Sequence, residues 1–244
     1  MKKRRFISVA VIILLSLFSA VDAANMDISP VRIFLDGKSR IEKITIKNQH
    51  DNLLNVQVNV FKWQQNETGA DVFEETKDII VVPKILALKK GEERIIRIGA
   101  NILPAAKEGT YRIYIEEIPT PEENRTGANV RLFMRIGVPV FLSPDKRIEK
   151  ITMEDATFRD NKLSFRVVNA GNHHFIINSV QVKWKDREGK PVSSQQLGGW
   201  YLLASCSRLY ELAIPDGIRG VLANIEIEVK TNGNGGSIVK EIAL

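Results

Sequence analysis

The sequence is poor in the residues on which disulfide scaffolds and metal sites depend. Its 244 residues include one cysteine, Cys206, and three histidines. A single cysteine excludes an internal disulfide, and so few cysteines and histidines leave little for a zinc site. Cys206 lies among small residues with no histidine beside it, so we expect an unreactive side chain that is buried or half-buried.

Motifs of the common enzyme classes are also missing. The chain has no G-x-S-x-G or H-E-x-x-H motif and no glycine-rich phosphate loop before a helix. We therefore expect no enzymatic activity, no cofactor and no metal. His173 and His174 could be metal ligands, but neighbouring strand residues point to opposite faces, which favours a turn or a strand end for this pair.

No apolar run reaches the ~20 residues needed to span a bilayer. An uncharged stretch, Phe6 to Ala20, follows four basic residues and precedes the small residues of Val21-Asp22-Ala23. A basic start, a short apolar stretch and an A-x-A-like end are typical of a secretory signal. We expect residues 1–23 to be removed, leaving an exported protein that is not embedded in the membrane.

Removal of the signal changes the meaning of the net charge. The whole chain carries a formal charge of +6, and residues 1–23 hold four basic residues and one acidic residue, so the mature chain carries +3. A charge this small removes the main support for a nucleic-acid partner.

The mature chain has the two-residue periodicity of strands, most clearly from Val56 to Trp63, and no convincing helical period. It predicts an all-β protein of two sandwiches, with a boundary at Ser143-Pro144-Asp145 and domains at 24–143 and 146–244. The expected strands are Val31–Leu35, Ile41–Ile46, Val56–Trp63, Ile79–Val82, Glu93–Ile98, Thr110–Ile118 and Val130–Leu142, then Ile148–Met153, Lys162–Asn169, Phe175–Lys185, Leu209–Ile214, Asn224–Val229 and Ser237–Leu244.

One strand carries an unusual combination of features. Val130, Leu132, Met134 and Ile136 share one face, and Pro139 follows them. An ordinary strand would pack this face on its own core. Proline cannot donate to a ladder, however, which confines the strand to an edge or a bulge, and a long apolar edge invites aggregation unless it has a partner. The pattern therefore favours side chains that are exposed in the free protein and an edge that pairs with a foreign strand.

Several segments resemble, in order, those of the PapD-like periplasmic pilus chaperones. The set covers nearly the whole mature chain, although no single motif in it is specific. The segments are Arg32–Gly37, the Pro83-x-Ile85-x-x-Leu88-x-x-Gly91-x-x-Arg94-x-x-Arg97-Ile98 pattern, Glu108–Pro119, the strand just described, Asn169-x-Gly171-Asn172 and Leu202-Leu203-Ala204-x-x-x-Arg208.

The resemblance implies two immunoglobulin-like domains set at an angle, with a cleft between them. Members of this family bind pilus subunits that lack their last strand, donate an edge strand to them without ATP and pass them to an outer-membrane usher. Carried over, Arg32 would hold the terminal carboxylate of the subunit. Val130, Leu132, Met134 and Ile136 would be the donor residues.

One departure suggests a divergent branch of the family. Pro139 occupies a position where the well-known branch has a second cleft lysine. The carboxylate would then be held by Arg32 alone, by another arginine such as Arg97 or Arg135, or in a different way.

Two other functions compete with the chaperone. A secreted structural pilus or surface protein should begin with an alternating apolar extension and usually contains a disulfide; this chain has one cysteine, and its first strand follows soon after the cleavage site. A carbohydrate-binding module should expose aromatic residues, whereas the three tryptophans are more simply explained as core residues.

Overall fold

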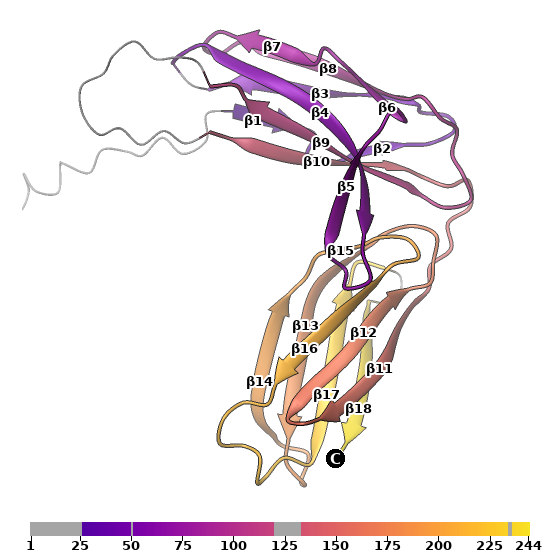
Figure 1. Cartoon of the computed structure of the whole chain (residues 1–244), viewed down its shortest axis with the longest axis vertical. Helices are drawn as coiled ribbons and strands as arrows, with labels where there is room; N and C mark the ends of the chain where they lie inside the picture. Colours follow the sequence, from indigo (N-terminus) through magenta and orange to yellow (C-terminus); the bar gives the residue numbers. More distant parts are fainter. Residues whose placement is uncertain (1–25, 50, 120–132, 234–235) are drawn as a thin grey trace, which may run out of the picture.

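The computed structural model describes residues 26–49, 51–119, 133–233 and 236–244, to which every structural statement below refers. These residues form two β-sandwiches joined end to end at an angle, with the C-terminus at the far end of the second (Figure 1). No helix in the described ranges is long and apolar enough to cross a membrane. The all-β prediction is confirmed.

The first sandwich consists of two sheets. One has the order β1-β3-β8-β6, and the other has the order β2-β10-β9-β4-β5, with β7 pairing to β4. The strands are β1 (Met26–Ser29), β2 (Ile33–Leu35), β3 (Ile41–Asn48), β4 (Leu54–Gln65), β5 (Asp71–Glu75), β6 (Ile79–Val82), β7 (Ile85–Leu88), β8 (Glu93–Ala100), β9 (Gly109–Glu117) and β10 (Arg135–Leu142).

The second sandwich is built in the same way from two sheets. One has the order β11-β12-β16, and the other has the order β14-β13-β17-β18, with β15 pairing to β13. The strands are β11 (Ile151–Arg159), β12 (Lys162–Asn169), β13 (Phe175–Lys185), β14 (Pro191–Gly198), β15 (Tyr201–Leu202), β16 (Ser207–Ala213), β17 (Asn224–Thr231) and β18 (Ser237–Ala243).

Alternation along the strands builds each core. On β4, Val56 and Val58 are at most 1% exposed, while Gln57 between them faces solvent. The same pattern on β3, β8 and β9 closes a first apolar core, and Phe165, Val182 and Ile227 belong to a separate second core. Each sandwich therefore has its own hydrophobic interior.

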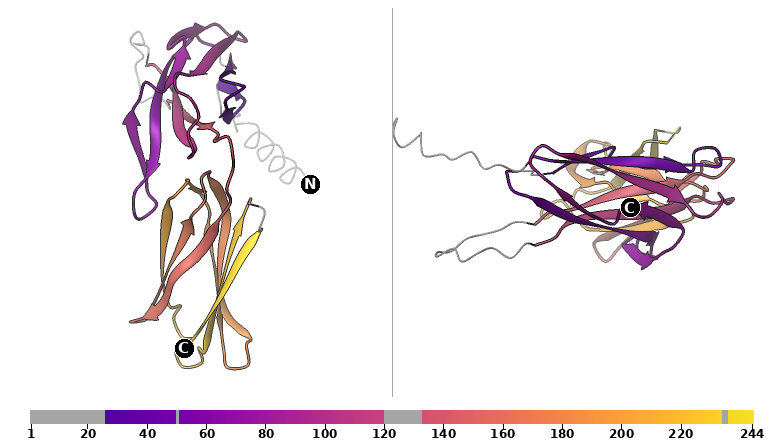
Figure 2. Two further views of the ribbon diagram at one scale, coloured as in Figure 1. Left: turned by 90° about the vertical axis from the view of Figure 1, so that its right-hand side faces the viewer. Right: turned by 90° about the horizontal axis from the view of Figure 1, so that it is seen from above.

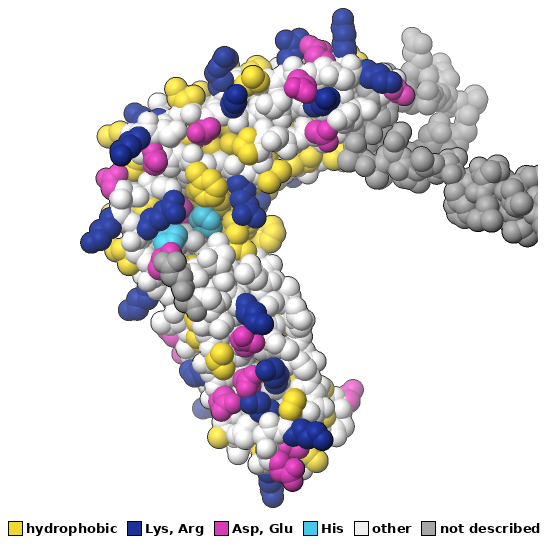
Figure 3. Space-filling view, turned by 180° about the vertical axis from the view of Figure 1, so that it is seen from behind, with side chains coloured by type: hydrophobic (Ala, Val, Ile, Leu, Met, Phe, Trp, Pro, Cys, Tyr) yellow, Lys and Arg dark blue, Asp and Glu magenta, His cyan; other side chains and the backbone are white. Residues whose placement is uncertain are grey.

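A third apolar cluster joins the two sandwiches. Trp63 and Phe141 from the first sandwich pack against Tyr201 and Leu203 from the second. The rings of Trp63 and Tyr201 lie 5.2 Å apart, edge to face. The left view of Figure 2 shows the sandwiches end to end, and the space-filling view shows the molecule bent there (Figure 3).

Most of the strands expected from the sequence are present, and several others were not foreseen. Thirteen strand regions were expected, while β1, β5, β7, β14 and β15 have no counterpart among them. The strand expected from Val130 to Leu142 begins at Arg135, and residues 130–132 lie outside the described residues, as does the signal segment 1–23. The boundary expected at residues 143–145 lies between β10 and β11.

Candidate functional site

Strand β10 has one side that is only partly covered. It pairs with β9 along its whole length, from Arg135 opposite Glu116 to Leu142 opposite Gly109. On the other side β2 pairs only with Val140 to Leu142, in parallel. Within the described part of the chain, Arg135 to Pro139 therefore forms a free edge. Pro139 is its last residue, because β2 pairs with β10 from Val140 onwards. The edge expected from Pro139 is present, but the strand beyond it lies inside the sheet.

The side chains expected to be exposed on this edge are partly buried. Met134 and Ile136 are half-buried and pack against the first core, and Val138 is 1% exposed. The expectation of exposed donor side chains is therefore wrong for Met134 and Ile136, because the facing sheet reaches this far along the strand. Val130 and Leu132 lie outside the described residues.

A residue that the sequence did not single out lies across the ladder from this edge. Arg112 on β9 pairs in register with Pro139 on β10. Its residue surface is only 7% exposed, and burial lowers the pKa of its guanidinium. The guanidinium carbon lies 4.0 Å from the centre of the Trp63 ring and 5.8 Å from that of Trp200. The charge therefore lies beside Trp63 of the first sandwich and Trp200 of the second, which together we call the aromatic frame.

Two of the three guanidinium nitrogens of Arg112 have no hydrogen-bond partner in the described part of the protein. Its Nε and Nη2 are buried and have no hydrogen-bond partner among the described residues. Arginine stays charged in proteins, and a buried charge without an acceptor is unfavourable. Buried polar groups are almost always hydrogen-bonded, so these two nitrogens make Arg112 a candidate binding residue, and its planar fork matches a carboxylate.

Arg32, the anchor expected from the sequence, lies beside this frame and is more exposed. It precedes β2, and its guanidinium carbon is 5.9 Å from the centre of the Tyr201 ring. Tyr201 in turn contacts Trp63, over which Arg112 lies. Arg32 and Arg112 therefore flank the same pair of aromatic rings at the junction.

The two other arginines considered from the sequence are placed differently. Arg135 lies on the free edge, but its Nε is 2.5 Å from Glu116 Oε1 and its guanidinium carbon is 4.0 Å from the centre of the Tyr114 ring. Its charge is already paired. Arg97 lies on β8 in the other sheet, between the fully buried Ile96 and Ile98, and so points away from the sandwich interior. Its place on the other sheet gives no support to a role of Arg97 in the cleft.

A polar joint fixes the junction next to the aromatic frame. Glu108 is buried, and its Oε2 accepts hydrogen bonds from the backbone N–H of His174 at 2.9 Å and from the Nδ1 of its ring at 2.8 Å. The ring of His174 stacks on Phe141 with centres 3.7 Å apart. Asn172 donates to the carbonyls of Ala106 and Lys146. His173 and His174 thus lie in a turn before β13, as the sequence favoured.

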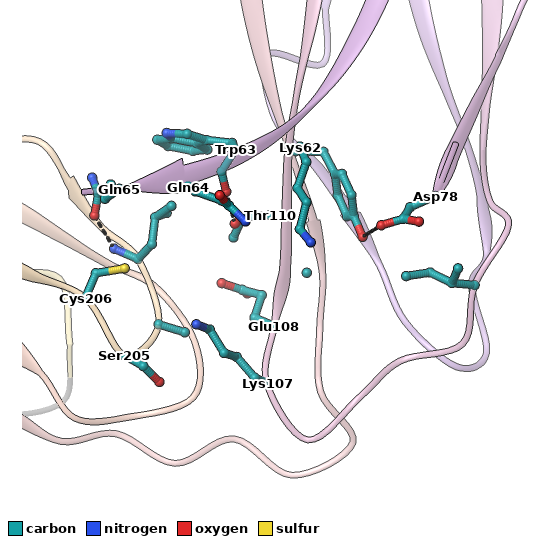
Figure 4. A pocket seen from close by; sticks show the side chains of 15 residues that line it. Lys62, Trp63, Gln64, Gln65, Asp78, Lys107, Glu108, Thr110, Ser205 and Cys206 are labelled. Carbon is teal, nitrogen blue, oxygen red and sulfur yellow. Dashed lines mark hydrogen bonds between the residues drawn. The ribbon is translucent and has the colours of Figure 1, made fainter. Parts of the chain in front are cut away.

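A cavity of about 540 Å³ lies at the same junction. Lys62, Lys107 and Glu108 of the first sandwich and Ser205 and Cys206 of the second line it (Figure 4). Burial raises the pKa of the Cys206 thiol, which keeps it protonated and unreactive at neutral pH. The half-buried cysteine agrees with the sequence expectation. Among the described residues no group of three or more His, Cys, Asp or Glu is arranged to hold a metal ion.

The sequence offered a partial signal for Arg112. It interrupts an apolar strand between Tyr111 and Ile113, where its side chain must point away from the core. That alternation does not reveal which residue faces it on the next strand, so its register with Pro139 had to come from the structure.

Solved structures with the same fold are found among pilus chaperones. A chain in the complex of the CsuC chaperone with the CsuE tip adhesion subunit, from archaic Csu pili of Acinetobacter baumannii, gives a TM-score of 0.60 at 18% identity, covering 90% of this chain and 98% of that chain. A chain in the complex of the SafA pilin with the SafB chaperone of Salmonella enterica gives 0.53 at 16% identity, covering 92% and 99%. The E. coli chaperone DraB gives 0.52 at 21% identity, covering 90% and 96%.

These structural similarities, which cover at least 90% of the chain, establish the fold of both sandwiches. A comparison with curated protein sequences found no significant match. The sequence profile of the PapD N-terminal domain, described as a pili and flagellar-assembly chaperone, matches residues 25–147. That match spans half of the chain and contains the free edge, Arg32 and Arg112, so the chain belongs to the PapD family of pili and flagellar-assembly chaperones.

Proposed function

We propose that the mature chain is a periplasmic chaperone that binds incomplete immunoglobulin-like pilus subunits at the free edge of β10 and passes them to an outer-membrane usher. The observation that carries this proposal is the combination of an uncovered strand edge with the buried, unpaired Arg112 beside it. Family membership favours a chaperone over a structural pilus protein. The proposal includes a signal at 1–23 and domains at 24–143 and 146–244.

The backbone supplies the first part of the interaction. Arg135 to Pro139 offer unpaired N–H and C=O groups on one side, and a foreign strand can extend the sheet there by β-augmentation. Main-chain hydrogen bonds contribute affinity without requiring one particular sequence. A subunit that lacks its last strand has both an open groove and a strand edge of its own, so pairing protects both proteins from edge-to-edge aggregation.

Arg112 sets the direction and the end of the bound strand. β10 runs from Arg135 towards the junction, where Phe141 belongs to the apolar cluster. A terminal carboxylate held by Arg112 would lie at the rung of Pro139, so the subunit strand would run parallel to β10 and end there. β2 occupies the next rungs in the same direction, from Ile33 opposite Val140. The subunit strand and β2 would follow each other along one edge.

The two cationic side chains divide the anchoring. Arg112 is buried between aromatic rings, so a carboxylate there would be desolvated and bound by a bidentate pair. Arg32 is exposed, and a charge at the rim affects mainly the rate of association and its salt dependence. We therefore assign the main anchor to Arg112 and a supporting role to Arg32. Strand pairing and ion pairing need neither ATP nor a cofactor.

Two measurements with a pilus subunit from the same organism test the proposal: aggregation of the subunit, and hydrogen–deuterium exchange of the chain with the subunit bound. The chain at an equimolar ratio should prevent aggregation of the diluted, denatured subunit. Backbone amides between Arg135 and Val138 that do not pair with β9 should then gain protection, while those of the edge strands β14 and β18 should not. Equal aggregation with and without the chain would refute the chaperone function. A bound subunit that left Arg135–Val138 unprotected would refute the binding edge.

A further inference from the structure

The β4–β5 hairpin extends beyond the first sandwich and lies against the second. Its two strands leave the first sandwich at the junction and point towards the second, as Figure 1 and the left view of Figure 2 show. Its tip is Asn66 to Ala70. Asn66 Oδ1 accepts hydrogen bonds from the Thr68 and Ala70 N–H groups, each at 3.0 Å, so the tip is internally ordered.

The tip makes direct contacts with the second sandwich. Arg166 Nη1 donates to the carbonyl of Glu67 at 2.7 Å. The Leu209 N–H of β16 points to the Thr68 carbonyl at 3.4 Å. β16 pairs with β12 on one side only within the described residues, so the hairpin covers part of a sheet edge that would otherwise face solvent.

Gly69 shows how closely the tip approaches. Its φ is +85°, and a Cβ built on it would lie 2.7 Å from Cγ, 2.9 Å from Cβ and 3.1 Å from Cα of Arg208. The last two atoms belong to the fixed part of Arg208 and cannot swing away. Any side chain at position 69 would therefore push the hairpin off β16.

The base of the hairpin is tied down as well. The side-chain amide of Gln65 donates to the Tyr201 carbonyl at 2.8 Å and accepts from the Leu203 N–H at 2.9 Å. The Trp200 indole N–H donates to Asp71 Oδ2 at 2.8 Å. Trp200 and Tyr201 are the residues of the second sandwich that stand around Arg112 and Arg32.

The hairpin contributes little to the core of its own sandwich. The first core contains Val60 and Ile79, and no residue between them belongs to it. Trp63 belongs instead to the junction cluster. The projecting part of the hairpin thus makes its contacts mainly with the second sandwich, while the joint of Glu108 and Asn172 ties the two sandwiches through other loops.

We propose that the β4–β5 hairpin is a brace that fixes the angle between the two sandwiches. By doing so it holds Trp200 and Tyr201 beside Arg112 and keeps water out of the anchor. Its consequence for subunit binding rests on the proposed function, whereas the brace itself is a property of the free chain.

The second sandwich contains a matched control. The turn from Asp186 to Lys190 has the same hydrogen-bond pattern as the hairpin tip. Asp186 Oδ1 accepts hydrogen bonds from the backbone N–H groups of Glu188 and Lys190. Asn66 Oδ1 accepts them in the same way from Thr68 and Ala70. Gly189 has a φ of +78°, and nothing lies within 4 Å of a Cβ built on it. Gly69→Ala and Gly189→Ala therefore strain the backbone alike, and only the first collides with the other sandwich.

The experiment measures the distance between spin labels on exposed strand positions of the two sandwiches, in a Cys206→Ser background. Wild type and Gly189→Ala should give one narrow distribution, and Gly69→Ala a broader, shifted one. Gln65→Ala, which introduces no strain, should also broaden it, whereas Gln57→Ala at the other end of β4 should not. Equal distributions for Gly69→Ala and Gly189→Ala, together with a narrow one for Gln65→Ala, would overturn the brace.

Subunit affinity is the second readout. Gly69→Ala should bind a pilus subunit several-fold more weakly than Gly189→Ala. If the distribution broadens while affinity stays the same, the link between brace and anchor is wrong. If wild type binds no subunit at all, the proposed function fails, and the distance measurement still decides whether the hairpin is a brace.

Discussion

Two ionisable residues at the start of β9, four positions apart, show opposite ways of burying a charge. Glu108 is 5% exposed and Arg112 is 7% exposed. The carboxylate of Glu108 accepts two hydrogen bonds from His174 in the other sandwich. Arg112 contacts the second sandwich as well, through Trp200, yet its Nε and Nη2 have no partner among the described residues.

The difference separates a structural joint from a binding residue. A buried charge that is fully hydrogen-bonded holds together the elements that supply its partners. A buried charge that is left unpaired weakens the free protein, and it persists where a ligand completes it. We therefore assign Glu108 to the architecture of the junction and, under the proposed function, Arg112 to subunit binding. Substitutions at the two positions should have different effects on binding and on folding.

The largest expected effect is the loss of subunit binding in Arg112→Met. Truncating one partner of a buried, hydrogen-bonded charge pair costs ~2–5 kcal/mol, which corresponds to between about thirty-fold and several thousand-fold in affinity. Titration with a pilus subunit measures it. Arg94→Met is the control, because Arg94 lies on β8 in the other sheet, away from the binding edge, and is paired with Glu92. A subunit with an amidated C-terminus should bind weakly to wild type and lose little more with Arg112→Met.

Glu108→Ala should instead destabilise the junction. It leaves the backbone N–H and the ring of His174 without their acceptor in a buried place, and such losses cost about 1–3 kcal/mol. Urea unfolding measures the change, and Glu108→Gln, which keeps one acceptor oxygen, should lose less. A Glu108→Ala variant as stable as wild type would show that this pair does not hold the sandwiches together.

The sequence predicted most of the strands whose burial alternates and missed short or exposed ones. Val56 to Trp63 alternates because one face of β4 packs on the core. β5, from Asp71 to Glu75, has no buried residue, and β14 has none either. Both are held by backbone pairing to a neighbouring strand. The hydrophobic pattern of a sequence does not reveal such pairing, so these strands were not predicted. The other three missed strands, β1, β7 and β15, have buried residues but are only two to four residues long.

The functional residues were harder to assign because they depend on register and on the choice of sheet. Pro139 indicated an edge from the sequence alone, since it lacks an N–H. The pairing of Pro139 with Arg112 joins two strands that are far apart in the chain, so no local pattern could reveal it. Arg97 alternates with core residues just as Arg112 does, but it lies on the other sheet. The sequence showed that both side chains point outwards without showing which sheet each belongs to.

The smallest expected effect is on the stability of the free protein in Arg112→Met. Removing the charge abolishes a cation–π contact with Trp63 worth ~0.5–1 kcal/mol, or about 2 kcal/mol when desolvated. It also removes the cost of an unsatisfied buried guanidinium, about 1–3 kcal/mol. These opposing contributions are similar in size, so we expect the free energy of unfolding to change by less than about 1 kcal/mol. Urea unfolding of the purified variant, beside Glu108→Ala under the same conditions, measures it.

A loss of stability as large as that of Glu108→Ala would mean that Arg112 is a structural residue like its neighbour. A variant that folds like wild type and no longer binds the subunit would place the function of this strand in the unpaired charge.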